Sequence, residues 1–352
     1  MSRFWSNLAL SLKPYVPGEQ PKITNLVKLN TNENPFPPSP KAVAAMLAVT
    51  GDDLRLYPDP TCGNLRQALA DYTGLSIGQV FVGNGSDEVL AHAFQGLLKQ
   101  DDKLLFPDIT YGFYPVYGDL FGIDYQTVAL ADDLSIDIQD YIGNNGGVII
   151  ANPNAPTGEL LSLDSIRTLL EGNPYRVVII DEAYIDFGGE SAVALVPEFD
   201  NLLVVQTLSK SRSLAGLRVG MAFGQAHLIQ GLERIKNSFN PYPLSREALA
   251  GATASIEDVD YFNETRQAII AQREALSSQL SQLGFSMSDS KANFVFVEHA
   301  EKSAADIATG LREQGVIVRH LTSSPRTQNR LRISIGTPAE CQTLITALQT
   351  LL

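Results

Sequence analysis

Short apolar runs recur through the middle of this chain, and they do not alternate apolar with polar residues. Runs of this kind are typical of strands that are buried on both faces of a sheet. They lie at residues 80–82, 103–106, 148–151, 176–180 and 202–205. Helical stretches separate them, as in a mostly parallel sheet with helices on both sides. The chain is therefore predicted to be an α/β protein with one large sheet.

The pattern changes after a Pro-Tyr-Pro turn at 241–243. A long helical stretch is followed by a strand, a helix, two strands and a last helix, which indicates a smaller α+β domain. These elements are expected at 257–283, 293–297, 304–313, 316–320, 330–335 and 338–352. The first 40 residues are rich in Pro, Asn and Lys and predict an extended arm. The expected domain limits are 1–50 for the arm with part of the small domain, 51–243 for the large domain and 244–352 for the small domain.

Composition narrows the class of partner. The formal net charge of −13 argues against nucleic acid, because binding phosphate backbones requires a basic face. The two cysteines, Cys62 and Cys341, give no disulfide framework, and the four histidines show no metal-ligand spacing, so no metal is expected. No secretory signal and no apolar run of membrane-spanning length is present in the sequence. A cytoplasmic protein without a membrane partner is predicted.

Polar residues directly follow each predicted strand of the large sheet. Ligands bind at the carboxyl ends of parallel strands, so we expect these clusters to converge on one crevice. After the strand at 202–205 comes a hydroxyl-rich turn, 207–213, that contains Lys210, and Arg218 follows eight residues later. A lysine partly removed from water is a nucleophile toward carbonyl carbons. Taken alone, however, a lysine is more often an ordinary surface residue.

The segment Gly83–Glu88 joins a strand to a helix through a glycine turn. A helix N-terminus with free N–H groups accommodates a phosphate, and the glycines permit close approach. The alternative is a tight turn in which Ser86 or Asp87 only caps the helix. Glu88 occupies the place of the third glycine of a dinucleotide fingerprint, and there is no Walker lysine, so nicotinamide enzymes and nucleotide hydrolases are disfavoured.

Two further clusters complete a set of chemical groups. Asp181 follows a buried strand and could keep a ring nitrogen protonated, although such an acid is often only a helix cap. Tyr111 offers a flat ring for stacking, although it could be an ordinary half-buried tyrosine. A carbonyl-attacking lysine, a carboxylate, a phosphate cradle with an arginine and an aromatic plane together match pyridoxal phosphate.

With these residues in place, the chain resembles the fold-type-I pyridoxal-phosphate aminotransferases, and more closely the histidinol-phosphate aminotransferase family. The resemblance covers nearly the whole chain. Its motifs lie at 29–35, 55–59, 83–88, 152–158, 181–187, 207–210, 214–220 and 331–337. The resemblance implies a homodimer in the cytoplasm that transfers an amino group between L-histidinol phosphate and 2-oxoglutarate in histidine biosynthesis.

The resemblance also implies a role for each matching residue. Lys210 bonds to the cofactor aldehyde and then moves the substrate's proton, Asp181 pairs with the pyridine nitrogen, and Tyr184 hydrogen-bonds the phenolic oxygen. Tyr111 stacks on the ring. The cofactor phosphate is held by Ser86, Asp87, Ser209 and Arg218, with help from Thr207 and from the partner subunit's Tyr57. The residues that face the substrate are Tyr15, Asn32, Arg319 and Arg332.

One position departs from the family pattern. The family usually has an asparagine before Pro-Thr-Gly that donates to the phenolic oxygen, and here that position is Ala155. Either Tyr184 carries this contact alone, or Asn152 or Asn154 shifts to compensate.

Two other functions stay open at this point. One is a relative with the same cofactor and another substrate, such as an aromatic-amino-acid aminotransferase or a phosphothreonine decarboxylase, which the motifs barely separate. The other is a non-catalytic binding protein on the same scaffold, which the presence of Lys210, Asp181 and Arg218 disfavours.

Overall fold

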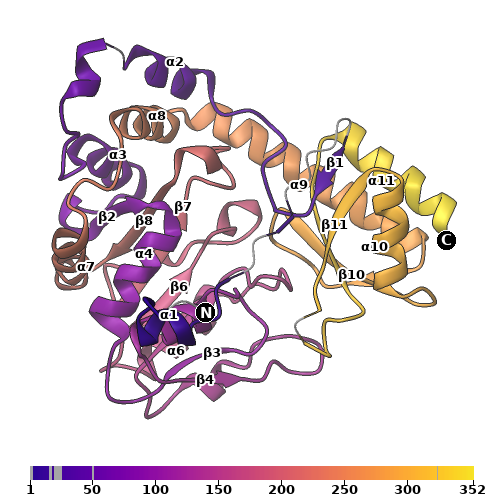
Figure 1. Ribbon diagram of the computed structural model, residues 1–352, viewed down its shortest axis with the longest axis horizontal. Helices are drawn as coiled ribbons and strands as arrows, with labels where there is room; N and C mark the ends of the chain where they lie inside the picture. The colour runs from indigo at the N-terminus through magenta and orange to yellow at the C-terminus, as the bar shows by residue number, and fades with distance from the viewer. Residues whose placement is uncertain (1–2, 16–17, 20–25, 50, 323) are drawn as a thin grey trace.

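The computed structural model describes residues 3–15, 18–19, 26–49, 51–322 and 324–352. Its strands form two separate sheets, one of seven strands and one of five, with helices around both (Figure 1). The strands are β1 (Val27–Leu29), β2 (Val80–Asn84), β3 (Leu104–Pro107), β4 (Tyr125–Val128), β5 (Gly147–Ala151), β6 (Val178–Asp181), β7 (Leu202–Thr207), β8 (Val219–Gly224), β9 (Phe285–Met287), β10 (Phe294–His299), β11 (Val316–His320) and β12 (Leu331–Ser334). The α-helices are α1 (Asn7–Ser11), α2 (Pro40–Ala48), α3 (Gly63–Thr73), α4 (Gly85–Ala93), α5 (Tyr114–Phe121), α6 (Leu163–Glu171), α7 (Ala226–Phe239), α8 (Arg246–Glu257), α9 (Val259–Gln282), α10 (Ala304–Glu313) and α11 (Pro338–Leu351).

The large sheet has the strand order β2-β8-β7-β6-β5-β3-β4. Neighbouring strands from β7 to β4 are parallel, and β8 runs antiparallel to both β7 and β2. All residues of β5, β6 and β8 are buried, which is why their sequences are apolar without alternation. The predicted α/β class with a mostly parallel sheet is confirmed.

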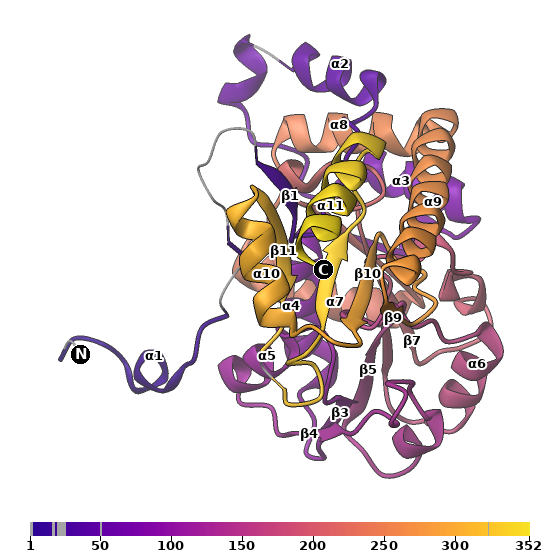
Figure 2. The same ribbon diagram turned by 90° about the vertical axis from the view of Figure 1, so that its right-hand side faces the viewer.

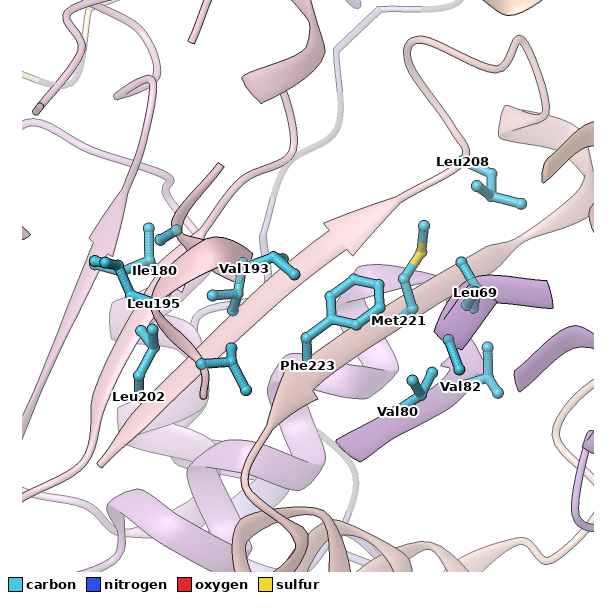
Figure 3. Close-up of a cluster of buried hydrophobic side chains, with 14 of the residues drawn as sticks. Leu69, Val80, Val82, Ile180, Val193, Leu195, Leu202, Leu208, Met221 and Phe223 are labelled. Carbon is cyan, nitrogen blue, oxygen red and sulfur yellow. The ribbon is translucent and has the colours of Figure 1, made fainter. Parts of the chain in front are cut away.

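Successive residues of these strands point to opposite faces, and each face has its own core. Val178 and Ile180 of β6 belong to a cluster with residues of α3, α6 and α8, whereas Ile179 belongs to one with residues of α4, α5 and α7. Figure 3 shows part of the first cluster, where Phe223 and Met221 of β8 face Leu69 of α3. Each fully buried aliphatic side chain contributes roughly 1.5–3 kcal/mol to the stability of the fold. The two cores therefore hold the sheet in place between the helices, including the edge at which β6 and β7 end.

The small sheet has the order β1-β11-β12-β10-β9 and packs with α9, α10 and α11. β1 enters this sheet parallel to β11, although it comes from the N-terminal segment. Residues 1–40, predicted as an extended arm, thus contain the short helix α1 and the strand β1. The predicted domain limits stay a prediction; α8, beyond residue 243, packs against α2 and α3.

Helix α1 lies apart from the other helices in Figure 2, and it buries none of its residues. Trp5, Leu8 and Leu10 on this arm are exposed. Within the described ranges, no helix is both long enough and apolar enough to cross a membrane.

Candidate active site

One pocket lies where the ends of β5, β6 and β7 meet the N-terminus of α4. Segments far apart in the sequence line it. The lining residues are Ser86, Asp87, Tyr111, Ala151, Ala155, Asp181, Ala183, Tyr184, Thr207, Ser209, Lys210 and Arg218. The structure therefore brings together every predicted cofactor residue except Tyr57. In the described part of the chain, no group of three or more His, Cys, Asp or Glu side chains could hold a metal ion.

Two glycines open an anion cradle at the start of α4. Gly85 has a φ of +78°, which favours glycine, and a Cβ on Gly220 would clash with the backbone of Gly85 and Ser86. The first N–H groups of a helix have no partners within the helix and carry the positive end of its dipole. Arg218 adds a cation, with its Nη2 2.9 Å from Asp87 Oδ2. This combination favours a bound phosphate group.

Asp181 leaves one carboxylate oxygen without a partner inside the pocket. Its Oδ2 accepts a hydrogen bond from the Tyr114 hydroxyl at 2.8 Å, whereas Oδ1 is buried and unpaired among the described residues. Burial, reinforced by the charge of Asp87 and opposed by hydrogen bonds from the Tyr114 hydroxyl and the main chain of Ala183, raises the pKa of Asp181 to about 6. A buried oxygen of this kind is costly unless a cation or an N–H group reaches it, so the site is suited to a protonated ring nitrogen.

The neighbouring acid, Glu182, is fully used by the protein. Its carboxylate accepts hydrogen bonds from Ser191 Oγ and Ala192 N at 2.6 Å and from Gln206 Nε2 at 2.8 Å. Burial still raises its pKa to about 7. Of the two consecutive acids, only Asp181 lines the pocket.

The ring of Tyr111 forms one wall. Its hydroxyl donates to Asp87 Oδ1 at 2.9 Å, and its ring meets that of Tyr114 edge-on at 5.6 Å between centroids. Burial, with the nearby Asp87 charge, raises the pKa of Tyr111, so the phenol stays neutral. The ring is thus held in place from both ends and is available for stacking.

Lys210 follows β7 in a loop that the N-terminal segment holds. Asn34 Nδ2 donates to the main-chain oxygens of Lys210 and Ser211 at 2.9 and 3.1 Å. The Lys210 Nζ lies 5.6 Å from the centre of the Tyr184 ring, and among the described residues it forms no ion pair. The loop is therefore fixed while the amine remains available to a ligand.

Ala155 leaves the pocket without the family's amide, and the structure shows what its neighbours do. Asn152 is paired in both directions with the main chain of Leu161, and Asn154 donates to Ile109 O and accepts from Thr110 Oγ1. Both asparagines are completely buried. Neither asparagine lines the pocket, whereas the side chain of Tyr184 does.

Two predicted substrate residues, Arg319 and Arg332, lie directly opposite each other on antiparallel β11 and β12. Arg332 donates to Asn30 O at 3.0 Å, but its buried Nε is unpaired in the described structure. Burial and the charge of Arg319 lower the pKa of Arg332. Neither arginine forms an ion pair among the described residues, so a bound anion would stabilise the two facing cations, and a guanidinium suits carboxylate or phosphate.

Tyr15, Asn32 and Tyr57 occupy different surroundings. Tyr15 packs against Phe113 at 4.5 Å between ring centres, beside the pocket wall. Asn32 is only 1% exposed and hydrogen-bonds Tyr184 rather than lining the pocket. Tyr57 is 78% exposed and outside the pocket, where it stacks on Tyr242 at 4.7 Å and its main-chain oxygen accepts from Arg246.

Sequence reasoning missed three residues that shape the site. Tyr114, which holds Asp181, carries no signal beyond its residue type. Asn34, which holds the Lys210 loop, lies in the motif at 29–35, but no role was assigned to it. Ser334, which binds the backbone of Asn32, ends β12 two residues after Arg332 and therefore shares its face of the strand, which was the available hint.

The fold and pocket define the class of protein: an α/β transferase of the fold-type-I architecture, with a lysine in its pocket just beyond a central strand. The family model described as aminotransferase class I and II matches residues 24–348. The chain belongs to the class I and II aminotransferase family.

Individual relatives are similar in sequence to this chain over nearly its whole length. It is 58% identical over 353 residues to histidinol-phosphate aminotransferase 2 of Dechloromonas aromatica, covering 99% of both chains. It is 60% identical over 348 residues to histidinol-phosphate aminotransferase 1 of Pseudomonas aeruginosa, again covering 99% of both. Among solved structures, the histidinol-phosphate aminotransferase of Sinorhizobium meliloti in complex with pyridoxal-5'-phosphate matches with a TM-score of 0.88 at 24% identity, covering 100% of this chain and 99% of that one. This last likeness concerns the fold.

Proposed function

We propose that this chain is a pyridoxal-phosphate-dependent aminotransferase that acts on L-histidinol phosphate and 2-oxoglutarate, forming imidazole acetol phosphate and L-glutamate. The observation that carries the proposal is the pocket itself, in which Lys210, Asp181 and Arg218 stand together. Full-length relatives at 58–60% identity, named histidinol-phosphate aminotransferases, support the substrate pair.

The residues present fit the cofactor at each of its functional groups. Arg218 and the glycine-lined N-terminus of α4 suit the phosphate, with Ser86, Ser209 and Thr207 beside them. The unpaired Asp181 Oδ1 suits a protonated ring nitrogen. Tyr111 supplies a stacking plane, Tyr184 a hydroxyl for the phenolic oxygen and Lys210 an amine for the aldehyde. These roles are proposals for this chain.

When bound, pyridoxal phosphate would supply an aldehyde carbon for the amino group of the substrate and a ring that accepts electron density. The chain's own residues handle the protons. Lys210 Nζ removes the proton from the substrate's α carbon and returns one when the amino group is transferred. The buried Asp181 carboxylate would hold the ring nitrogen in its protonated form.

Substrate binding would use the two opposed arginines. L-histidinol phosphate carries a phosphate ester, and 2-oxoglutarate carries two carboxylates, so one site must accept both anion types in turn. Arg332 and Arg319 supply paired guanidinium groups from neighbouring strands, and Tyr15 closes the side near Tyr111. Guanidinium groups bind either anion through two parallel hydrogen bonds.

The test is a half-reaction measured by the absorbance of the loaded protein with each amino donor in turn. We expect L-histidinol phosphate to convert the cofactor to its amino form far faster than phenylalanine or tyrosine at equal concentration. Equal or faster conversion by an aromatic amino acid would point to the aromatic aminotransferase instead. Carbon dioxide release from phosphothreonine would point to the decarboxylase.

We also propose a homodimer in which the partner subunit's Tyr57 reaches the cofactor phosphate. The support is that Tyr57 is exposed and away from its own chain's pocket, on a loop held by Arg246. The unpacked arm, with exposed Trp5 and Leu8, offers apolar surface to a second copy. A cytoplasmic location stays a prediction.

Mixed dimers test this sharing directly. Tyr57→Phe removes one hydroxyl, and we expect it to weaken cofactor binding about 10-fold or more, the usual effect of losing a hydrogen bond to a charged group. A dimer of one Tyr57→Phe chain and one Lys210→Ala chain should keep one complete site and recover about half the wild-type activity at limiting cofactor. If the mixed dimer were no more active than the dimers of either variant alone, Tyr57 would belong to the site of its own chain. Tyr175→Phe, at a 90% exposed tyrosine, is the control.

A further inference from the structure

Asn32 has every polar group paired inside the protein. Its main-chain N–H donates to Ser334 Oγ at 2.9 Å, and its main-chain oxygen accepts from Asn293 Nδ2 at 3.0 Å. Its side-chain Oδ1 accepts from Ser334 Oγ and its Nδ2 donates to the Tyr184 hydroxyl oxygen, both at 3.0 Å. Such complete pairing at a residue that is 1% exposed fixes the amide rigidly.

The network determines which way the Asn32 amide faces. Because Ser334 Oγ already accepts the Asn32 main-chain N–H, its single proton is free to be donated to Oδ1. With the amide turned over, Ser334 would have no acceptor for that proton, and Tyr184 would donate to Asn32. The hydrogen bonds are all satisfied only when Nδ2 faces Tyr184.

The direction of this bond decides what the Tyr184 hydroxyl can do. Its oxygen accepts from Asn32, so its own proton is directed elsewhere, and among the described residues no other partner takes it. Tyr184 lines the pocket. The phenolic proton is therefore available to an acceptor bound there.

The backbone conformation of Asn32 is energetically unfavourable. Its φ is +55°, in the left-handed region that side chains other than glycine seldom adopt, although Asn and Asp tolerate it best. Ser334 at the end of β12 and Asn293 before β10 hold it there, and both belong to the small-sheet side. Backbone strain of this kind persists where the surroundings over-determine the conformation, often at functional sites.

We propose that Asn32 is a positioning residue that directs the Tyr184 hydroxyl toward the phenolic oxygen of the cofactor, replacing the support that an amide at position 155 would give. The inference rests on the proposed function, because the acceptor belongs to the cofactor. The side chain of Ala155 has no donor, and the amide groups of Asn152 and Asn154 donate to main-chain oxygens. The contact thus depends on one tyrosine and on the residue that orients it.

The expected signature is a change in how the bound cofactor titrates. A hydrogen bond donated to the phenolic oxygen stabilises its negative charge. The nitrogen of Lys210, once bonded to the cofactor, shares a proton with this oxygen. That proton is lost more easily when the negative charge of the oxygen is stabilised in this way. Losing the donor should raise the midpoint of the cofactor's pH-dependent absorbance change. A hydrogen bond to a charged group typically accounts for about one pH unit.

Asn32→Asp tests this with little change of shape. A carboxylate can only accept, so the Tyr184 hydroxyl would turn toward it and away from the cofactor. We expect the midpoint to rise by about one unit in Asn32→Asp and similarly in Tyr184→Phe, and the double variant to match Tyr184→Phe alone. Ala155→Asn supplies a second donor and should bring the midpoint of the Asn32→Asp protein back down.

The controls separate the alternatives. Asn237→Asp adds the same charge at an exposed asparagine and should leave the midpoint unchanged. An unchanged midpoint in Asn32→Asp would overturn the inference. It would also be overturned if Asn32→Asp raised the midpoint equally in wild type and in Tyr184→Phe, because the added charge alone would then explain the rise. Should Asn32→Asp fail to fold, a Ser334→Ala protein whose midpoint stays at the wild-type value would overturn the inference equally.

If the wild-type protein bound no pyridoxal phosphate, the proposed function itself would fail. If the wild type were loaded and active but the substitutions left the midpoint unchanged, only the role of Asn32 would be refuted.

Discussion

Lys210→Ala is expected to lower amino transfer by about 10⁴-fold or more while pyridoxal phosphate still binds without a covalent bond. Lys210 is the one lysine that lines the described pocket, so its loss removes both the nucleophile and the group that moves the α proton. Acid–base catalysis alone contributes typically about 10²–10⁴-fold. The remaining pocket, with Arg218 and the start of α4, should still hold the cofactor phosphate.

Single-turnover absorbance with L-histidinol phosphate measures this loss, and equilibrium dialysis measures retained cofactor. Lys302→Ala, at an exposed lysine, serves as the matched control and should behave as wild type. Turnover near the wild-type rate in Lys210→Ala would end the proposed mechanism.

Asp181→Asn is expected to have opposite effects on catalysis and on stability. Loss of the carboxylate leaves the ring nitrogen without its anionic partner, and removing one preorganised electrostatic contact of this kind costs about 10²–10³-fold in rate. In the cofactor-free protein the same change removes a buried, half-paired charge and should stabilise the fold at neutral pH.

The pH dependence gives the sign of the stability effect. Burial raises the pKa of Asp181 from its ordinary value of 3.8 to about 6, so the folded state holds the proton more tightly than the unfolded state. The contribution of Asp181 to the free energy of unfolding is therefore greatest below pH 4 and falls as the pH rises through 6. A difference of this size corresponds to about 3 kcal/mol at most.

Urea unfolding of the cofactor-free proteins between pH 4 and 7 checks this prediction. The stability of Asp181→Asn minus that of wild type should grow across this range, and Asp52→Asn, at an exposed acid, should show no such trend. A difference in stability that does not change with pH would mean that burial does not raise the pKa of Asp181. Saturation with pyridoxal phosphate should remove most of the difference, because the ring nitrogen then pairs with the carboxylate.

Much of the site followed from the chain's local pattern. The strand that ends at Asp181 and the strand that leads to Lys210 were visible as apolar runs, and neighbouring parallel strands must end on the same edge. The glycine turn before Ser86 also follows from its local sequence, since close approach and a positive φ both demand glycine there.

Other parts depended on packing that no local pattern encodes. β4 and β8 were not predicted, because β4 is a half-exposed edge strand and β8 carries two glycines within an antiparallel insertion. Tyr114 reaches Asp181 across 67 residues of sequence, and Asn32 reaches Ser334 across 302. Contacts of that range arise only once both sheets are assembled.

Every role proposed for the pocket depends on Lys210 being the residue that bonds to the cofactor. Reduction of the loaded wild-type protein with borohydride, followed by digestion and mass spectrometry, tests this bond most directly. We predict that the reduced cofactor is found on the peptide that contains Lys210, and that prior addition of L-histidinol phosphate diminishes the labelling. Label on another lysine, or a protein that gives no labelled peptide after incubation with pyridoxal phosphate, would contradict the assignment of Lys210.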